Sequence, residues 1–167
     1  MGLLAKLLKA LNSDASPWQL ALGLSLGMIM GLTPLLGLHS LVILFVVLFC
    51  RINISAFLVS WSAFSLIALP LTSSFANLGE SLLLAENLQG AWTAFYNTYL
   101  GQLTQFYHTL TIGSVLVAVI LFPFALLLSK KLVEKYRLTF MQWVNQLRII
   151  KIIKGSGFYN IYQRLGE

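Results

Sequence analysis

The residues best placed to do chemistry in this chain surround one helix-breaking sequence, GLTPLLG at 31–37. A helix that starts at such a break inside an apolar segment directs its positive dipole end there, which suits an anionic group such as a phosphate. The break is therefore a candidate substrate path, although it could equally serve packing alone. The predicted path residues are Thr33, Pro34, Gly37, His39 and Ser40.

The remaining reactive side chains form no catalytic or metal-binding pattern. His39 and His108 are isolated in sequence, and no Ser-His-Asp order, phosphate-binding loop or suitably spaced pair of carboxylates is present. A lone histidine on an apolar helix is more often a packed residue than a proton relay. Cys50 is the only cysteine, so neither an internal disulfide nor a cysteine metal site is possible. We expect a protein that is not an enzyme and holds no metal or cofactor.

The composition is that of a membrane protein. Of the 167 residues, 58% are hydrophobic and 10% are charged, whereas soluble domains contain about 25% charged residues. Residues 16–50 form 35 consecutive positions without Lys, Arg, Asp or Glu. A chain this apolar needs lipid as the solvent for much of its surface. The predicted fold class is an all-α integral membrane protein.

Two helix-start signals divide the segment 16–50. Ser16-Pro17 combines an N-cap residue with proline at the first helical position, and Thr33-Pro34 repeats this pattern. Helices over 17–31 and 34–50 would be about 22 and 25 Å long, which is shorter than the hydrocarbon core of about 30 Å. The lengths favour a broken, re-entrant-like hairpin that enters and leaves by one face. Two full spans joined by an exposed loop are the alternative.

Three glycines mark a packing face on the first of these helices. Gly23, Gly27 and Gly31 recur every four residues and therefore share one side of the helix. Small residues at this spacing allow a second helix to approach closely in lipid.

The rest of the chain divides by composition. An amphipathic interfacial helix is predicted over 1–14, the membrane domain over 15–129, and a basic cytoplasmic tail over 130–167. Within the membrane domain, the hairpin 16–50 is followed by a helix over 53–72, which Pro70 kinks or ends, an aromatic interfacial region over 75–108, and a transmembrane helix over 109–129. A carbohydrate-stacking surface is a weaker interpretation of the aromatic region.

The charge pattern predicts the orientation. The net charge is +6, and no Lys or Arg lies between Ile52 and Ser129. The positive-inside rule places the N-terminus, Arg51 and the C-terminal tail in the cytoplasm, and residues 75–108 outside. The hairpin agrees with this orientation, because it returns the chain to the side from which it came.

Several short motifs carry a family resemblance. They are the glycine repeat that runs into GLTPLLGLH at 31–39, RINI at 51–54, PLT at 70–72 and Gly79. Over residues 15–80 the chain resembles a bacterial membrane family known as domain of unknown function 2062. Leu69 departs from that pattern, in which Asn precedes the proline. The resemblance implies a second motif made of Arg51, Asn53, Pro70 and Thr72, and an inner-membrane location. Some family members appear joined to glycosyltransferase-like domains, which suggests envelope biology.

The leading functional hypothesis is an inner-membrane protein that handles or transports a lipid-like or anionic amphipathic molecule in envelope biogenesis. The alternative is a non-transporting scaffold that anchors an envelope partner through its glycine face and basic tail. The expected partners are membrane lipids and either further copies of the chain or another envelope membrane protein, with no nucleic acid.

Overall fold

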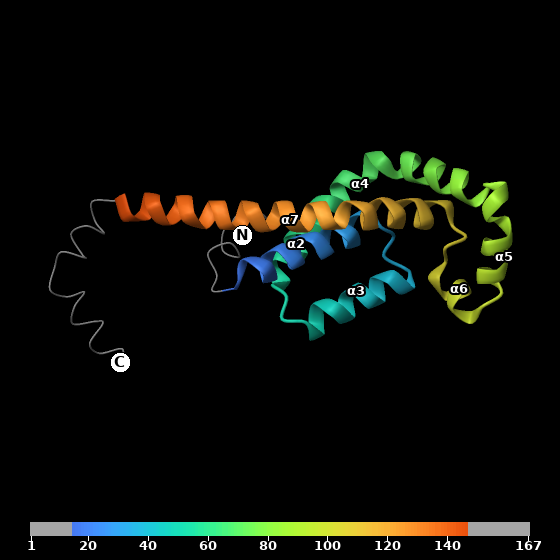
Figure 1. Cartoon of the computed structure of the whole chain (residues 1–167), viewed down its shortest axis with the longest axis horizontal. Coiled ribbons are helices and arrows are strands. Elements are labelled where there is room, and N and C mark those ends of the chain that lie inside the picture. The colour runs from blue at the N-terminus through green and yellow to red at the C-terminus, as the bar shows by residue number, and fades with distance from the viewer. Residues whose placement is uncertain (1–14, 147–167) are drawn as a thin grey trace.

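The computed structural model describes residues 15–146, and all regular structure in that range is helical (Figure 1). The elements are α2 (Pro17–Leu32), α3 (Leu38–Phe49), α4 (Ile54–Leu83), the short 3₁₀ helix η1 (Glu86–Leu88), α5 (Gln89–Tyr96), α6 (Tyr99–Thr104) and α7 (Thr109–Gln146). The prediction of an all-α chain is confirmed over these residues. The expected amphipathic helix over 1–14 and the end of the basic tail, 147–167, lie outside the described residues.

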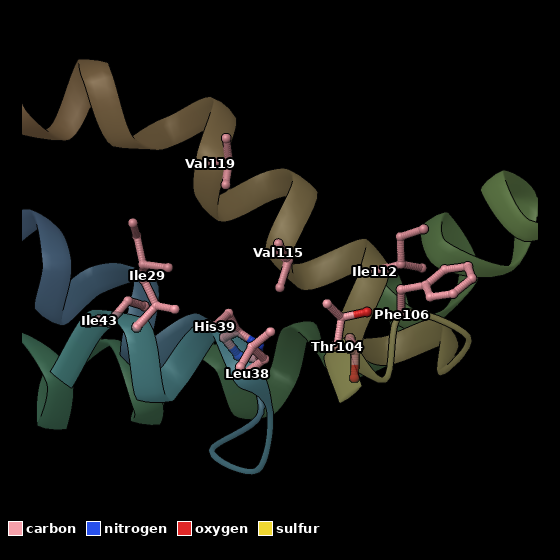
Figure 2. A pocket seen from close by; sticks show the side chains of 11 residues that line it. Ile29, Leu38, His39, Ile43, Thr104, Phe106, Ile112, Val115 and Val119 are labelled. Atoms are coloured by element: carbon pink, nitrogen blue, oxygen red, sulfur yellow. The ribbon is translucent and has the colours of Figure 1, made fainter. Parts of the chain in front are cut away.

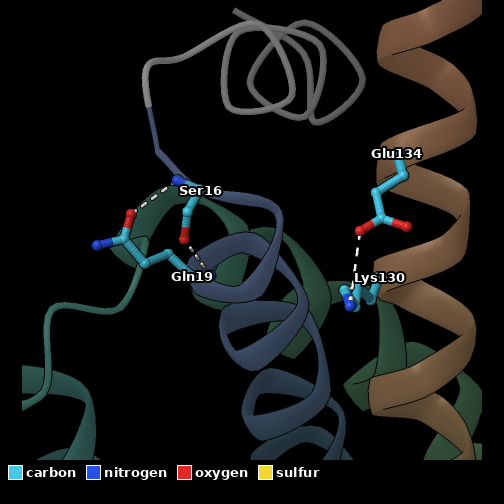
Figure 3. A network of polar contacts seen from close by, with 4 residues as sticks. All are labelled: Ser16, Gln19, Lys130 and Glu134. Atoms are coloured by element: carbon cyan, nitrogen blue, oxygen red, sulfur yellow. Dashed lines mark hydrogen bonds and ion pairs between the residues drawn. The ribbon is translucent and has the colours of Figure 1, made fainter.

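Helix α2 begins where the sequence predicts. The Ser16 hydroxyl accepts a hydrogen bond from the Gln19 backbone N–H at 3.2 Å, and the Gln19 side chain accepts one from the Ser16 backbone N–H at 2.8 Å (Figure 3). This reciprocal pair satisfies two backbone donors at the helix start. Pro17 occupies the first helical position, where its missing N–H costs nothing.

The second helix of the hairpin does not begin at Pro34, so that prediction is wrong. The Thr33 backbone N–H and hydroxyl both donate to the Ile29 carbonyl, at 3.1 and 2.8 Å, so Thr33 closes α2 and caps nothing downstream. Residues 34–37 form a loop, and α3 starts at Leu38 without a side-chain cap. The break is therefore a non-helical loop that separates two helices.

The hairpin returns the chain to the end of the molecule where it began. The Asn53 backbone N–H donates to the Gln19 carbonyl at 3.4 Å, which fixes the start of α4 beside the start of α2. At 1.5 Å per residue, α2 is about 24 Å long and α3 about 18 Å. Both are shorter than a bilayer core of about 30 Å.

Helices α4 and α7 are longer than the segments 53–72 and 109–129 that the sequence suggested. Asn53 caps α4 by accepting from the Ala56 N–H at 2.9 Å, and the helix continues through Pro70 to Leu83. In Figure 1, α4 changes direction between its two halves, as expected for a helix with an internal proline. Helix α7 continues through Pro123 to Gln146 and so includes the first part of the predicted basic tail.

The core consists of α2 packed between α4 and α7. Leu20 of α2, Ala56 of α4 and Val133 of α7 form one buried cluster. A second cluster joins Met28 and Leu32 to residues of α4 and α7 further along the molecule. Helix α3 lies outside this group and packs on it through Ile43 and Val47.

Glycines set the distance between the core helices. A Cβ atom on Gly23 would lie 2.7 Å from the Asn53 carbonyl oxygen, and one on Gly31 would lie 2.8 Å from the Trp61 carbonyl oxygen. A Cβ on Gly27 would collide with the Phe57 carbonyl oxygen of the same helix, α4. The three glycines thus lie directly against the α4 backbone, a contact that larger side chains would prevent.

A second glycine contact joins α4 to α7. A Cβ on Gly79 would collide with the Thr109 carbonyl, and one on Gly113 would collide with the Phe75 carbonyl. Each helix therefore presents a glycine to the backbone of the other.

Two helices are long and apolar enough to cross a membrane, namely Ile54–Leu83 and Thr109–Thr139. Most of their apolar residues face outward, whereas a core helix of a soluble protein would be mostly buried. Leu66, Leu69, Phe124 and Leu128 are each about two-thirds exposed. These surfaces favour a lipid environment.

Candidate functional site

A cavity of about 400 Å³ lies between α3 and the N-terminal half of α7, at the level of the loop 33–37 (Figure 2). One wall comes from α3 and α2, the other from α7, and the end near α6 is formed by Thr104 and Phe106. The lining residues are Ile29, Leu38, His39, Val42, Ile43, Thr104, Phe106, Thr111, Ile112, Val115 and Val119. Figure 2 shows Ile29, Ile43, Val115 and Val119 around one end of this space, and Thr104, Phe106 and Ile112 at the other.

The cavity lining is apolar and carries no Lys, Arg, Asp or Glu. Its polar side chains are His39, Thr104 and Thr111. His39 Nε2 lies 2.9 Å from the Pro34 carbonyl oxygen, and the Thr104 hydroxyl donates to the Gly101 carbonyl at 2.7 Å. Thr111 is 94% buried, with 6% of its surface exposed. Such a surface can hold an apolar chain together with a small number of polar atoms.

The predicted path residues around the break are only partly brought together. The Pro34 carbonyl accepts from both His39 and Ser40, the latter at 3.2 Å, and this pair fixes the loop to the first turn of α3. The hydroxyls of Thr33 and Ser40 are thereby bonded to backbone rather than open to the cavity. Of the five residues, His39 alone lines the cavity.

The position of the His39 ring leaves no room for a side chain at Gly37. A Cβ at this position would lie 2.6 Å from His39 Cε1 and 2.7 Å from Nδ1, so the glycine leaves room for the ring to reach the Pro34 carbonyl. The loop and the histidine therefore act as one unit at the edge of the cavity.

The second motif is spread along the molecule. Arg51 is exposed between α3 and α4, and Asn53 caps α4. Pro70 and Thr72 lie in the middle of α4, where the Thr72 hydroxyl donates to the Ala68 and Leu69 carbonyls at 3.1 and 3.0 Å. Asn53 and Pro70 are separated by about 26 Å of helix, so these four residues do not form one site.

The aromatic region packs around Phe106. The ring of Phe106 lies 4.9 Å from Phe95, 5.6 Å from Trp92 and 6.4 Å from Tyr96, measured between centroids. The Trp92 indole N–H donates to the Leu82 carbonyl at 3.0 Å, which ties the cluster to the end of α4. Phe106 also lines the cavity, so the aromatic region closes one end of it.

The basic residues gather at the opposite end, where α2 begins. The Lys130 ammonium lies 4.4 Å from the centroid of the Trp18 ring and 3.7 Å from Glu134 Oε1, the latter pair drawn in Figure 3. Arg137 donates to the Ala15 carbonyl at 2.7 Å. The cations of α7 and the start of α2 therefore share one end of the molecule.

Sequence reasoning missed the cavity and Thr111. The walls come from residues 29–43 and 104–119, which are distant in sequence, and Thr111 has no neighbouring motif to mark it. Among the described residues there is also no group of three or more His, Cys, Asp or Glu side chains that could hold a metal ion.

Together these features define a helical protein with a glycine-packed core, apolar outer faces and an uncharged cavity. The chain belongs to the family described as an uncharacterized protein conserved in bacteria (DUF2062), whose sequence profile matches residues 3–141. The resemblance noted over 15–80 is confirmed and extends over most of the chain. Searches of curated proteins and of solved structures found no match.

Proposed function

We propose that this protein resides in the bacterial inner membrane and binds a lipid-like amphipathic molecule during envelope biogenesis. The observation that carries the proposal is the cavity between α3 and α7. Its volume of about 400 Å³ is within the range of small-molecule sites, roughly 300–1,000 Å³. Its apolar walls suit a hydrocarbon chain.

The proposed membrane placement uses α4 and α7 as the two full spans. They are joined by residues 84–108, which contain no Lys or Arg, whereas Arg51 and Lys130 flank the spans at the other end. With two crossings between Arg51 and Lys130, both termini are cytoplasmic and residues 84–108 face the periplasm. The shorter α2 and α3 enter and return from the cytoplasmic side.

This orientation is tested by cysteine labelling in intact cells. Cys50 is replaced by serine, and single cysteines are placed at Tyr99, which is 90% exposed, and at Lys131. A membrane-impermeant maleimide should label position 99 directly and position 131 only after permeabilisation. Equal labelling of both positions in intact cells would overturn the placement.

The cavity has an apolar approach from lipid. Val42 lines the cavity and is also 51% exposed, and Leu41 and Phe45 beside it on α3 are more than half exposed. A hydrocarbon chain can therefore reach the cavity along α3 without crossing a charged surface. An ion path has no support from the lining, which contains no Lys, Arg, Asp or Glu.

The scaffold alternative has less support. It assigns a partner to the basic tail and to the surface formed by Gly23, Gly27 and Gly31, and that glycine surface is covered by α4 of the same chain. The remaining exposed apolar faces are those expected for contact with lipid.

The cavity is tested by filling it. Val115→Trp places an indole in the space between α3 and α7, while Leu116→Trp adds the same ring at the neighbouring, outward-facing position. The purified protein in detergent is incubated with vesicles of bacterial phospholipid extract, re-isolated, and its retained lipid is measured by mass spectrometry. We expect retained lipid with wild type and Leu116→Trp, and at least a tenfold loss with Val115→Trp. Equal retention by all three proteins contradicts the proposal.

A further inference from the structure

We infer that the cavity selects an amphipath whose buried polar group is an uncharged oxygen function, and that Thr111 is the residue that binds it. The inference rests on the proposed function, since it names the chemical class of the ligand that the cavity would hold. It narrows the sequence hypothesis, which allowed an anionic ligand.

Thr111 carries a polar group without a partner among the described residues. Its side chain is 94% buried, yet its hydroxyl makes no hydrogen bond within residues 15–146. The neighbouring hydroxyls behave differently: Ser114 donates to the Leu110 carbonyl at 2.7 Å, and Thr104 donates to the Gly101 carbonyl at 2.7 Å. Buried hydroxyls are normally paired, so an unpaired one beside a cavity is a candidate group for binding a ligand there.

Thr111 lines the cavity, and its unpaired oxygen is not fully enclosed by protein. Among described residues, Ser25 alone has a polar side-chain atom that is both unpartnered and fully enclosed by protein. The Thr111 oxygen is therefore not sealed, and the open space that this residue lines is the cavity. A ligand there can accept a hydrogen bond from Thr111 or donate one to it.

The surroundings exclude a buried charge. None of the cavity residues is Lys or Arg, and the chain has neither between Ile52 and Ser129. The Nε2 atom of His39 is already engaged by the Pro34 carbonyl. A phosphate or carboxylate placed there would lose its hydration without gaining the positive charge of a Lys or Arg, which is unfavourable. An ester carbonyl, an alcohol or an amide meets no such penalty.

The position of Thr111 also orients the ligand. Thr111 and Val119 are about 12 Å apart along α7, and Thr111 lies toward the end that Phe106 closes. The polar group of the ligand therefore lies near the aromatic region, and its hydrocarbon chain runs along Val115 and Val119 toward Ile43. Figure 2 shows Phe106 and Val119 in different parts of the lining, with Val115 between them.

The experiment compares three radiolabelled probes of equal chain length on the purified full-length protein in detergent. The probes are 1-monooleoylglycerol, oleyl phosphate and 1-octadecene, and the dissociation constant of each is measured. We expect 1-monooleoylglycerol to bind most tightly to the wild type. Thr111→Val should weaken its binding about fivefold, the effect of one lost hydrogen bond, and leave 1-octadecene unchanged.

Two further variants separate recognition from folding. Thr93→Val removes a hydroxyl of α5 that is already paired with the Gln89 carbonyl and does not line the cavity, so it should not change the binding of 1-monooleoylglycerol. Thr111→Ser retains the hydroxyl and should bind 1-monooleoylglycerol as the wild type does, which keeps the test valid if Thr111→Val folds poorly.

The failures of the two proposals are distinguishable. Tighter binding of oleyl phosphate than of 1-monooleoylglycerol, or an unchanged affinity in folded Thr111→Val, overturns the inference and leaves the proposed function standing. Weak binding of 1-monooleoylglycerol to Thr111→Ser also overturns it, because the hydroxyl is then not the recognised group. Absence of binding for all three probes overturns both.

Discussion

Helices α2 and α3 come from the same uncharged segment, but the protein packs them very differently. Ten of the 16 residues of α2 are buried, against three of the 12 residues of α3. Helix α2 has glycine at three positions spaced four residues apart and lies against the α4 backbone, whereas α3 has no glycine within it and consists mostly of bulky apolar residues. Apolar composition alone therefore does not determine which of the two helices is buried. The regular spacing of small residues in α2 does.

The same difference explains where the cavity lies. Close contact between α2 and α4 leaves no space between them, while α3 stands apart from α7, and Leu38, Val42 and Ile43 line the space between those two helices. The α2–α4 contact is structural, and the looser α3 provides one wall of a site. Three substitutions test this comparison.

The largest effect is expected for Gly27→Ala. The new Cβ would collide with the Phe57 carbonyl oxygen, and a backbone atom cannot move aside without shifting α4. Overpacking of this kind costs about 1–3 kcal/mol or more, so we expect a loss near the upper end of that range. Reversible unfolding in a mixed-micelle SDS titration measures the change.

Gly90→Ala is the matched control for that substitution. Gly90 is also helical, in α5, but a Cβ there meets no atom within 4 Å. Because alanine has the higher helix propensity, its stability should be unchanged or up to about 1 kcal/mol greater. Similar losses at positions 27 and 90 would refute the role given to the glycine spacing.

A smaller effect is expected for Gly37→Ala, at the start of α3. The new Cβ would meet the His39 ring, a side chain that can rotate away at the cost of its hydrogen bond to the Pro34 carbonyl. The expected loss is about 1 kcal/mol, the usual net value of one hydrogen bond. A loss as large as that of Gly27→Ala would show that α3 is held as firmly as α2.

The smallest effect is expected for Ser60→Ala. The Ser60 hydroxyl donates to the Leu24 carbonyl, a hydrogen bond that crosses from α4 to α2. Such contacts between membrane helices are worth about 0.6 kcal/mol on average. Ser62→Ala removes a bond to Leu58 within α4 and should have no measurable effect on the α2–α4 contact. A loss above about 2 kcal/mol for Ser60→Ala would mean that the hydroxyl, rather than the glycines, dominates this contact.

Helix starts with a local signal could be predicted from sequence. Ser16-Pro17 and Asn53 cap α2 and α4 because the groups that they satisfy lie within three residues. Thr33-Pro34 has the same appearance but the opposite role, since the Thr33 hydroxyl bonds backward to Ile29. A Thr-Pro pair can end one helix or begin the next, and the local sequence does not indicate which of the two it does.

Features that depend on contacts between distant residues were harder to predict from the sequence. Pro70 suggested either a kink or an end, and the structure has the first: α4 changes direction but continues to Leu83, and Gly79 in its second half packs against α7. The sequence alone did not decide between these two roles of the proline. The cavity depends on how far α3 is held from α7, and Thr111 becomes notable only when the packing shows that its hydroxyl lacks a partner.

The position of α7 at the end of the described chain also bears on the order of assembly. Helix α2 is covered by α4, whose contacts with it lie about 30 residues later, and by α7, whose contacts lie about 100 residues later. Because a chain emerges from the ribosome in sequence, the α2–α4 pair is complete before α7 has been made. Met28 and Leu32 lack their α7 neighbours during that interval, and the Arg137 bond to the Ala15 carbonyl, which spans 122 residues, can form only after α7 is made. The helix that completes the core is thus the one that closes the cavity, so the site cannot exist before assembly is finished.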